Sequence, residues 1–228
     1  MVQSQRTKRS EWIDVLNILS CIAVVALHVS LNVFTPERSR NWLFAVAIQA
    51  TCIFAVPVFF MLSGMNLINY RDRYTTKVFF QKRFKRTGLA LIGASIVCYL
   101  LFGLFPDSFY NCTSYIGSFG IIDFVNRFLT NSINDIYWFL YSILYLYLLT
   151  PLLSLARKSK KLMKYLLFLC MFAGIVIPFL EVTLGLDDSL FASLFGWPLF
   201  KTNSLLYFLL GAYIGNFKPD HTHDKVIP

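Results

Sequence analysis

The stretch WIDVLNILSCIAVVALHVS, residues 12–30, decides the fold of this chain. It is long and apolar enough to form a membrane-spanning helix. At 100° per residue, Asn17 and His28 point within about 20° of each other, and Asp14 and Cys21 lie on the same side. We expect this polar seam to face protein or water, because a polar or charged group that faces lipid at the bilayer centre is costly.

The composition of the whole chain extends this interpretation. Of its 228 residues, 57% are hydrophobic and 14% are charged, and the mean hydropathy is +0.59. These values are too apolar for a soluble domain. At about 20 residues per span, the length accommodates six membrane helices with short loops. The sequence therefore predicts an all-α fold, a polytopic integral membrane helix bundle with about six transmembrane helices plus an interfacial amphipathic helix.

The predicted spans cover about residues 12–34, 42–67, 89–105, 136–156, 165–186 and a last stretch from Trp197 or Ser204 to 217. Pro57 and Gly64 in the second span indicate a kink or a close approach by a neighbouring helix. We expect the first, second and fourth spans to line a polar cavity around His28. Together the spans form one transmembrane domain, residues 1–217, followed by a polar cytoplasmic tail, residues 218–228.

The segment between the third and fourth predicted spans, residues 119–134, is too polar to cross the membrane. Its apolar residues gather on one side of a helix, and Asp123, Asn126 and Arg127 interrupt any spanning potential. We expect an interfacial or re-entrant segment on the outer face.

The net charge of +9 could suggest a nucleic-acid partner, but the positions of the basic residues argue against one. Of the 21 Lys and Arg residues, 17 fall in four segments, residues 1–11, 69–86, 157–164 and 218–228. This bias is the one that insertion topology produces in cytoplasmic segments. We therefore predict no nucleic-acid binding, and a multi-pass protein of the plasma membrane with a cytoplasmic N-terminus.

The strongest of these basic segments, NYRDRYTTKVFFQKRFKR at residues 69–86, alternates cations with aromatic residues. This pattern predicts an amphipathic helix on the cytoplasmic surface. Its arginines could hold the phosphates of a nucleotide or coenzyme. Composition alone favours a plain topology signal that contacts lipid headgroups.

Spacing alone leaves two roles open for His28, which lies about 24 Å along its helix from the cytoplasmic end. A neutral imidazole can act as a general base toward a hydroxyl group. The other role is structural, with the ring donating a hydrogen bond to a neighbouring carbonyl. No second histidine or carboxylate stands at ligand spacing, so we predict no metal site.

Four stretches in register resemble acyltransferase family 3, integral membrane proteins that modify surface glycans and other envelope molecules with acyl groups. The first resembles the family's opening, in which an Asp-x-Leu-Arg/Lys turn precedes a histidine. The other three resemble its Phe-Phe-x-x-Ser-Gly block, its basic pair and its Trp-Phe-Leu span. In this chain they read Asp14-Val15-Leu16-Asn17 with His28, VPVFFMLSG at 56–64, KRFKR at 82–86, and YWFLYSILYLYLLTPLL at 137–153.

The resemblance implies transfer of an acyl group, commonly acetyl, from cytoplasmic acyl-CoA to a hydroxyl of an envelope carbohydrate or similar acceptor across the bilayer. It implies His28 as the catalytic base and Arg83 and Arg86 as contacts for the coenzyme phosphates. The family's basic residue before the histidine is Asn17 here, which offers the coenzyme hydrogen bonds but no charge. The proline that usually follows the basic pair is also missing.

Length is the larger departure, since family members generally have about ten spans and six are predicted here. The chain is then a natural truncation, a fragment, or a six-helix relative that pairs with a partner chain supplying the missing helices. These expectations keep a second function open, a non-catalytic membrane protein that acts as an assembly partner or a transporter component.

Overall fold

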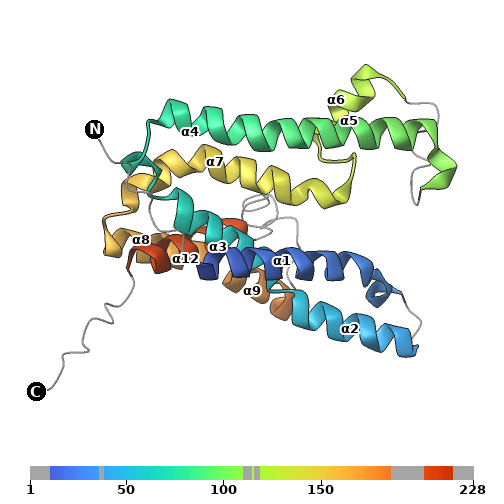
Figure 1. Cartoon of the computed structure of the whole chain (residues 1–228). Coiled ribbons are helices and arrows are strands. Elements are labelled where there is room, and N and C mark those ends of the chain that lie inside the picture. The colour runs from blue at the N-terminus through green and yellow to red at the C-terminus, as the bar shows by residue number, and fades with distance from the viewer. Residues whose placement is uncertain (1–10, 36–38, 110–114, 116–118, 186–202, 218–228) are drawn as a thin grey trace, which may run out of the picture. The chain divides into compact units, whose positions relative to one another are not determined.

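The computed structural model describes residues 11–35, 39–109, 115, 119–185 and 203–217, and throughout these residues its regular elements are helices (Figure 1). Among the described residues, five helices are long and apolar enough to cross a membrane, namely Glu11–Val29, Arg40–Asp72, Thr76–Leu104, Asp135–Ala156 and Lys160–Leu184. The prediction of an all-α, polytopic membrane protein is confirmed.

The last predicted span is shorter than expected. Helix α12, Ser204–Asn216, is apolar but has only 13 residues, whereas about 20 are needed to cross the hydrocarbon core. The alternative start at Trp197 and the predicted tail, residues 218–228, lie outside the described residues. Within the part that the structure describes, α12 is therefore a short apolar helix and not a sixth full span.

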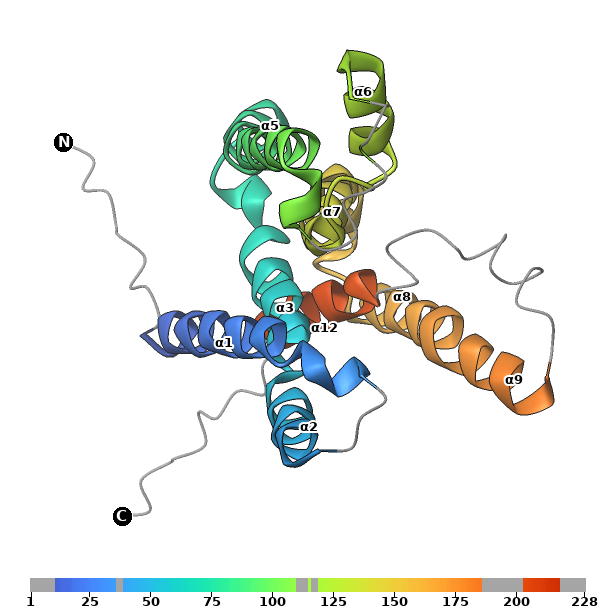
Figure 2. The same ribbon diagram turned by 90° about the vertical axis from the view of Figure 1, so that its right-hand side faces the viewer.

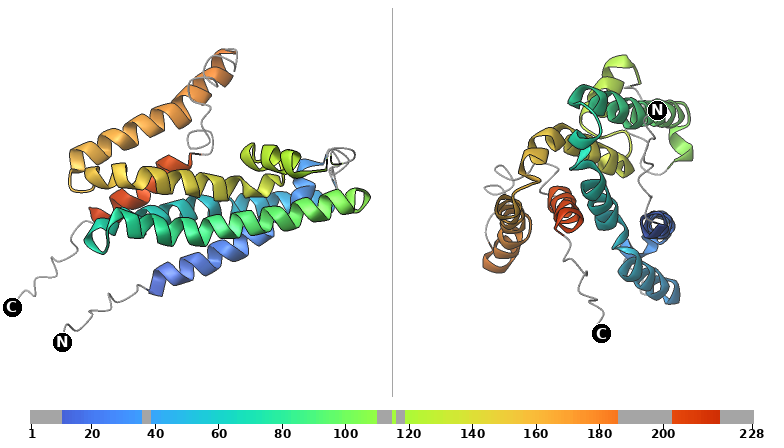
Figure 3. Two further views of the ribbon diagram at one scale, coloured as in Figure 1. Left: turned by 90° about the horizontal axis from the view of Figure 1, so that it is seen from above. Right: turned by 60° about the vertical axis from the view of Figure 1, so that its left-hand side comes forward.

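The chain divides into two compact units, Met1–Asn69 with Ala156–Pro228, and Tyr70–Leu155. The first unit contains α1 (Glu11–Val29), a 3-10 turn (Leu31–Phe34), α2 (Arg40–Cys52), α3 (Ala55–Leu67), α8 (Lys160–Met171), α9 (Ile177–Leu184) and α12. A π-helical turn, Phe172–Val176, joins α8 to α9, and Figure 3 shows the two as one continuous long helix.

The second predicted span is interrupted near Pro57. The pyrrolidine ring of Pro57 clashes with the carbonyl four residues earlier, that of Ile53, and Pro57 has no N–H to donate. The α-helix accordingly ends at Cys52 and begins again at Ala55, so that α2 and α3 are separate helices. The predicted kink at this proline is confirmed.

Helices α3 and α12 pack directly against each other in the first unit (Figure 2). Gly64 and Gly211 lie at the contact, and a Cβ added to either would overlap backbone atoms of the facing helix, at Phe208 and Met61 respectively. Small residues allow this approach, which takes the place of hydrophobic attraction between helices in lipid. The close approach predicted at Gly64 is confirmed.

The second unit consists of a 3-10 turn (Tyr70–Asp72), α4 (Thr76–Arg83), a π-helical turn (Phe84–Gly88), α5 (Leu89–Leu104), a 3-10 turn (Pro106–Ser108), α6 (Ile121–Leu129), a 3-10 turn (Asp135–Tyr137) and most of α7 (Trp138–Ala156). In Figures 1 and 2, α4–α5 runs beside α7, and α6 is inclined to α5 and does not run parallel to it.

The prediction of a separate surface helix at residues 69–86 is wrong in one respect. Helix α4 continues through the π-helical turn into α5 as one helix, Thr76–Leu104. Aromatic packing explains why, since Phe79 is fully buried and its ring lies 4.4 Å from that of Tyr70 and 6.1 Å from that of Tyr147 on α7, measured between centroids. The greater part of the basic segment, from Thr76, is thus continuous with the apolar helix that follows it.

Candidate functional site

The end of α1 carries His28, and it is anchored by a side chain from α2. The last four carbonyl groups of a helix have no partner within it, and inside a membrane such groups must be satisfied by protein. The side-chain amide nitrogen of Gln49, Nε2, donates to the Leu27 carbonyl at 2.8 Å and to Ser30 Oγ at 2.9 Å. The hydroxyl of Ser30 donates in turn to the same Leu27 carbonyl at 3.1 Å.

These three groups form a closed triangle with matched donors and acceptors. Both N–H bonds of the Gln49 amide are used, and the single hydroxyl proton of Ser30 is used as well. A second contact holds the chain just beyond, where Trp42 Nε1 donates to the Val33 carbonyl at 3.1 Å. Trp42 and Gln49 of α2 therefore hold the backbone around His28.

His28 itself is exposed, and its imidazole has no hydrogen-bond partner among the described residues. The buried side of α1 is formed by Ser20 and Ala23, while Cys21 is exposed and Asn17 is half-buried. The polar seam is thus only partly packed, since Asp14 and Asn17 are half-buried and Cys21 and His28 are exposed. The small residues occupy the packed face, because only they allow α3 to approach closely. The imidazole of His28 lies outside this packed face.

The basic pair lies at the π-helical turn of the second unit. Arg83 is the last residue of α4 and half-buried, and Arg86 lies within the turn and is exposed. The Nε of Arg83 is buried and finds no hydrogen-bond partner among the described residues. Such a donor fits an anionic oxygen, because a guanidinium pairs readily with phosphate. π-Helical turns are also frequent at functional sites.

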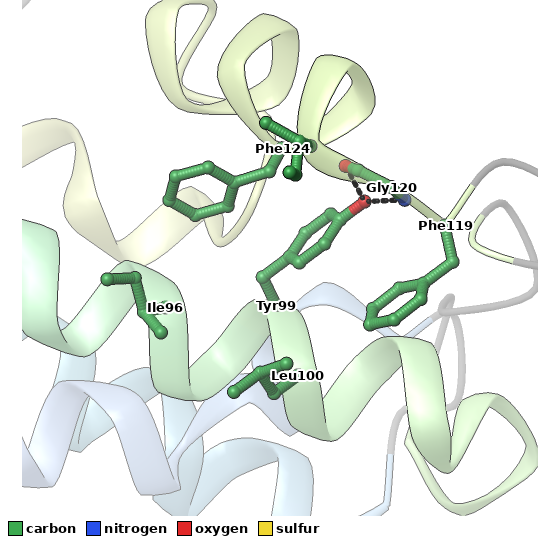
Figure 4. Close-up of a pocket in the computed structure, with 7 residues that line it drawn as sticks. Ile96, Tyr99, Leu100, Phe119, Gly120 and Phe124 are labelled. Carbon is green, nitrogen blue, oxygen red and sulfur yellow. Dashed lines mark hydrogen bonds between the residues drawn. The ribbon is translucent and has the colours of Figure 1, made fainter.

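An apolar cavity of about 370 Å³ lies between α5 and the start of α6 (Figure 4). Its lining consists of Ile96, Tyr99, Leu100, Phe119, Gly120, Ile121 and Phe124. The volume is within the range of small-molecule sites, but no charged side chain lines it. This cavity suits a hydrocarbon group and cannot hold the phosphates of a coenzyme.

The hydroxyl of Tyr99 is already used by its own surroundings. It accepts from the Gly120 N–H at 2.9 Å and directs its single proton at the Gly120 carbonyl and Asp123 Oδ2, each at 2.9 Å. Figure 4 shows the tyrosine pointing across the cavity wall to this glycine. Arg127 Nε donates to Asp123 Oδ2 at 2.7 Å, and its guanidinium lies 4.1 Å from the ring centroid of Tyr115. The network attaches α6 to α5.

Burial of the Arg127 guanidinium lowers its pKa, but the hydrogen bond and negative charge of Asp123 outweigh this, so that the pKa lies above its ordinary value. This arginine is consequently charged at every physiological pH. Its ion pair with Asp123 stabilises the segment predicted to be interfacial, which the structure shows as helix α6.

The predicted site residues fall in both units. Asn17 and His28 belong to the first unit, and Arg83 and Arg86 belong to the second. The described residues contain no group of three or more His, Cys, Asp or Glu side chains that could hold a metal ion.

Sequence reasoning missed Gln49 and the second glycine of the α3–α12 contact. A glutamine inside an apolar span is a signal in itself, since polar residues in membranes usually have a functional or structural partner. Gly211 and Gly215 form a Gly-x-x-x-Gly pattern, which is typical of closely packed membrane helices. Both signals were present in the printed sequence.

Comparison with known proteins supplies the remaining observation. Residues 10–225 match the model of a family described as an acyltransferase domain. No curated protein and no solved structure matches the chain. The family match includes all the helices described above and the four stretches on which the resemblance rests. Since it extends over nearly the whole chain, the protein belongs to acyltransferase family 3 and is a membrane acyltransferase.

Proposed function

We propose that the chain is an O-acyltransferase that moves an acyl group, acetyl in the simplest case, from acyl-CoA to a hydroxyl of an envelope glycan or a similar acceptor. The observation that carries the proposal is the family match over residues 10–225. The accessible imidazole of His28 at an anchored helix end adds the chemistry, because a hydroxyl needs a base to become a nucleophile.

In this proposal His28 takes the proton from the acceptor hydroxyl. The oxygen then attacks the thioester carbonyl, the carbon–sulfur bond breaks, and the acyl group remains on the oxygen as an ester. The coenzyme leaves as a thiolate and receives the proton from the imidazolium, so that His28 returns to its neutral form. Protons and charges balance without a metal ion.

The coenzyme is assigned to the basic pair and Asn17. Arg83 and Arg86 contact its phosphates, and the buried, unpartnered Nε of Arg83 supports this role. Asn17, half-buried on the same helix as His28, contributes hydrogen bonds through its amide. The uncharged cavity beside Tyr99 is not part of the coenzyme site.

We place the protein in the plasma membrane with a cytoplasmic N-terminus. The support is the concentration of 17 of the 21 Lys and Arg residues in the four segments proposed to be cytoplasmic. This orientation puts the start of Thr76–Leu104, which carries the basic pair, on the side where acyl-CoA is found.

The test is transfer of radiolabelled acetyl groups. The full chain is reconstituted in lipid vesicles and supplied with radiolabelled acetyl-CoA and an envelope polysaccharide fraction. We expect ester-linked label in the polysaccharide that is released by mild alkali, and none when acetyl phosphate replaces acetyl-CoA. Absence of both transfer and acetyl-CoA binding would contradict the proposal.

A further inference from the structure

Gln49 is the one amide of α2 whose two N–H bonds both end on the turn that carries His28. We propose that Gln49 is a positioning residue for acyl transfer, which holds the end of α1 so that the imidazole of His28 points at the acceptor. The inference rests on the proposed function, in which His28 is the base.

The first argument is that the imidazole has no anchor of its own. Its ring makes no hydrogen bond among the described residues and is exposed. The direction of its Cα–Cβ bond, and hence the reach of the ring, is therefore set by the backbone alone. Hydrogen bonds hold the chain on both sides of His28, at the Leu27 carbonyl before it and at the Ser30 hydroxyl after it.

The second argument concerns the alternative arrangements of this turn. Helix α1 ends at Val29, and Ser30 has left the helical conformation, with φ −103° and ψ 28°. Without Gln49, the Leu27 carbonyl would keep only the Ser30 hydroxyl, and that hydroxyl would lose its donor. The last turn of α1, which includes His28, would then lose its hydrogen bonds to α2 and could move relative to that helix.

The third argument is the specificity of the amide. A carboxylate in place of the amide has only acceptor oxygens and would repel the Leu27 carbonyl. A hydrocarbon side chain of the same length fills the space but donates nothing. The two N–H bonds of a primary amide, directed at two acceptors one turn apart, meet both needs.

The experiment measures the maximal rate of CoA release and the half-saturating acetyl-CoA concentration in reconstituted vesicles with the polysaccharide fraction. The variant is Gln49→Met, which keeps the length and removes both donors. The matched control is Thr51→Val on the same helix, because the Thr51 hydroxyl donates only within α2, to the Ala47 and Ile48 carbonyls at 2.8 and 3.1 Å.

We expect Gln49→Met to lower the maximal rate about 10- to 100-fold while the half-saturating acetyl-CoA concentration stays within about twofold, since the coenzyme contacts are elsewhere. Thr51→Val should match the wild type in both quantities. A wild-type maximal rate for Gln49→Met, or a loss that comes entirely from a raised half-saturating concentration, would overturn the inference.

Two further variants keep the test decisive. If Gln49→Met does not give a monodisperse protein, Ser30→Ala is used instead, because it removes only the hydroxyl that accepts from Gln49. Ser30→Ala should lower the maximal rate several-fold. A wild-type maximal rate for Ser30→Ala would overturn the inference. His28→Ala separates the two claims: its full activity rejects the proposed function, while an inactive His28→Ala beside a fully active Gln49→Met rejects only the positioning role.

Discussion

Gly64 of α3 and Phe208 of α12 meet so closely that a Cβ on the glycine would overlap the phenylalanine carbonyl group. The same relationship recurs one turn along, where Gly211 faces the Met61 backbone. Both contacts join segments that are far apart in the sequence, and both lie in the unit that carries His28. The stability of this unit should therefore depend on glycine at both positions, because any larger residue would collide with the facing helix.

The first prediction concerns this contact. Gly64→Ala should destabilise the protein by about 1–3 kcal/mol or more, because the added carbon meets rigid backbone and forces the helices apart. Thermal unfolding in detergent, followed by tryptophan fluorescence, measures the change. Gly93→Ala is the control, since nothing lies within 4 Å of a Cβ there. Equal stability of Gly64→Ala and Gly93→Ala would contradict the packing described here.

The second prediction concerns the attachment of α6. Tyr99→Phe removes the hydroxyl that bonds Gly120 and Asp123, so that α6 loses hydrogen bonds to α5 at a cost of about 0.5–1.5 kcal/mol each. Hydrogen exchange should accelerate selectively in residues 119–129. The matched variant is Tyr145→Phe on α7, whose side chain is exposed, and it should leave exchange in α6 unchanged. Unaltered exchange in Tyr99→Phe would show that other contacts hold the helix.

The third prediction concerns the basic pair. Arg83→Gln and Arg86→Gln should each raise the half-saturating acetyl-CoA concentration about tenfold or more, because a charged hydrogen bond to phosphate contributes roughly 1.5–3 kcal/mol. Lys77→Gln removes the same charge from an exposed position on α4 and should have little effect. If all three variants raise the half-saturating acetyl-CoA concentration equally, Arg83 and Arg86 act only through overall charge.

The fourth prediction concerns Asn17. Its amide can form only neutral or singly charge-assisted hydrogen bonds, so Asn17→Ala should raise the half-saturating acetyl-CoA concentration by a smaller factor, about two- to tenfold. Asn41→Ala, an exposed asparagine at the start of α2, serves as the control in the same kinetic assay. No change for Asn17→Ala would remove this residue from the coenzyme site.

Much of the fold followed from local physical rules. Apolar length predicted six spans, and five of them are helices long enough to cross a membrane among the described residues. Pro57 marked the break between α2 and α3, because a proline clashes with the carbonyl four residues earlier. Long-range packing was harder to predict. The apolar and basic pattern of residues 69–86 predicted a separate surface helix. In the structure, Phe79 packs against Tyr147 on α7, and α4 continues into α5.

The candidate site shows the same division. The resemblance selected His28 from the sequence, but the polar seam did not identify the buried positions of α1, which are the small residues Ser20 and Ala23. The partner that holds the end of α1, Gln49, is 22 positions from Leu27 in sequence. Helical periodicity relates residues within one helix only, so it could not pair them.

The most direct test of the central claim is the rate of acetyl-CoA-dependent transfer by His28→Ala, measured beside Cys21→Ala, another exposed residue of the same helix. We predict that Cys21→Ala keeps wild-type transfer and that His28→Ala loses about 100- to 10,000-fold, the usual contribution of a general base. Transfer by His28→Ala at the wild-type rate would contradict the assignment of His28 as the base and with it the proposed mechanism.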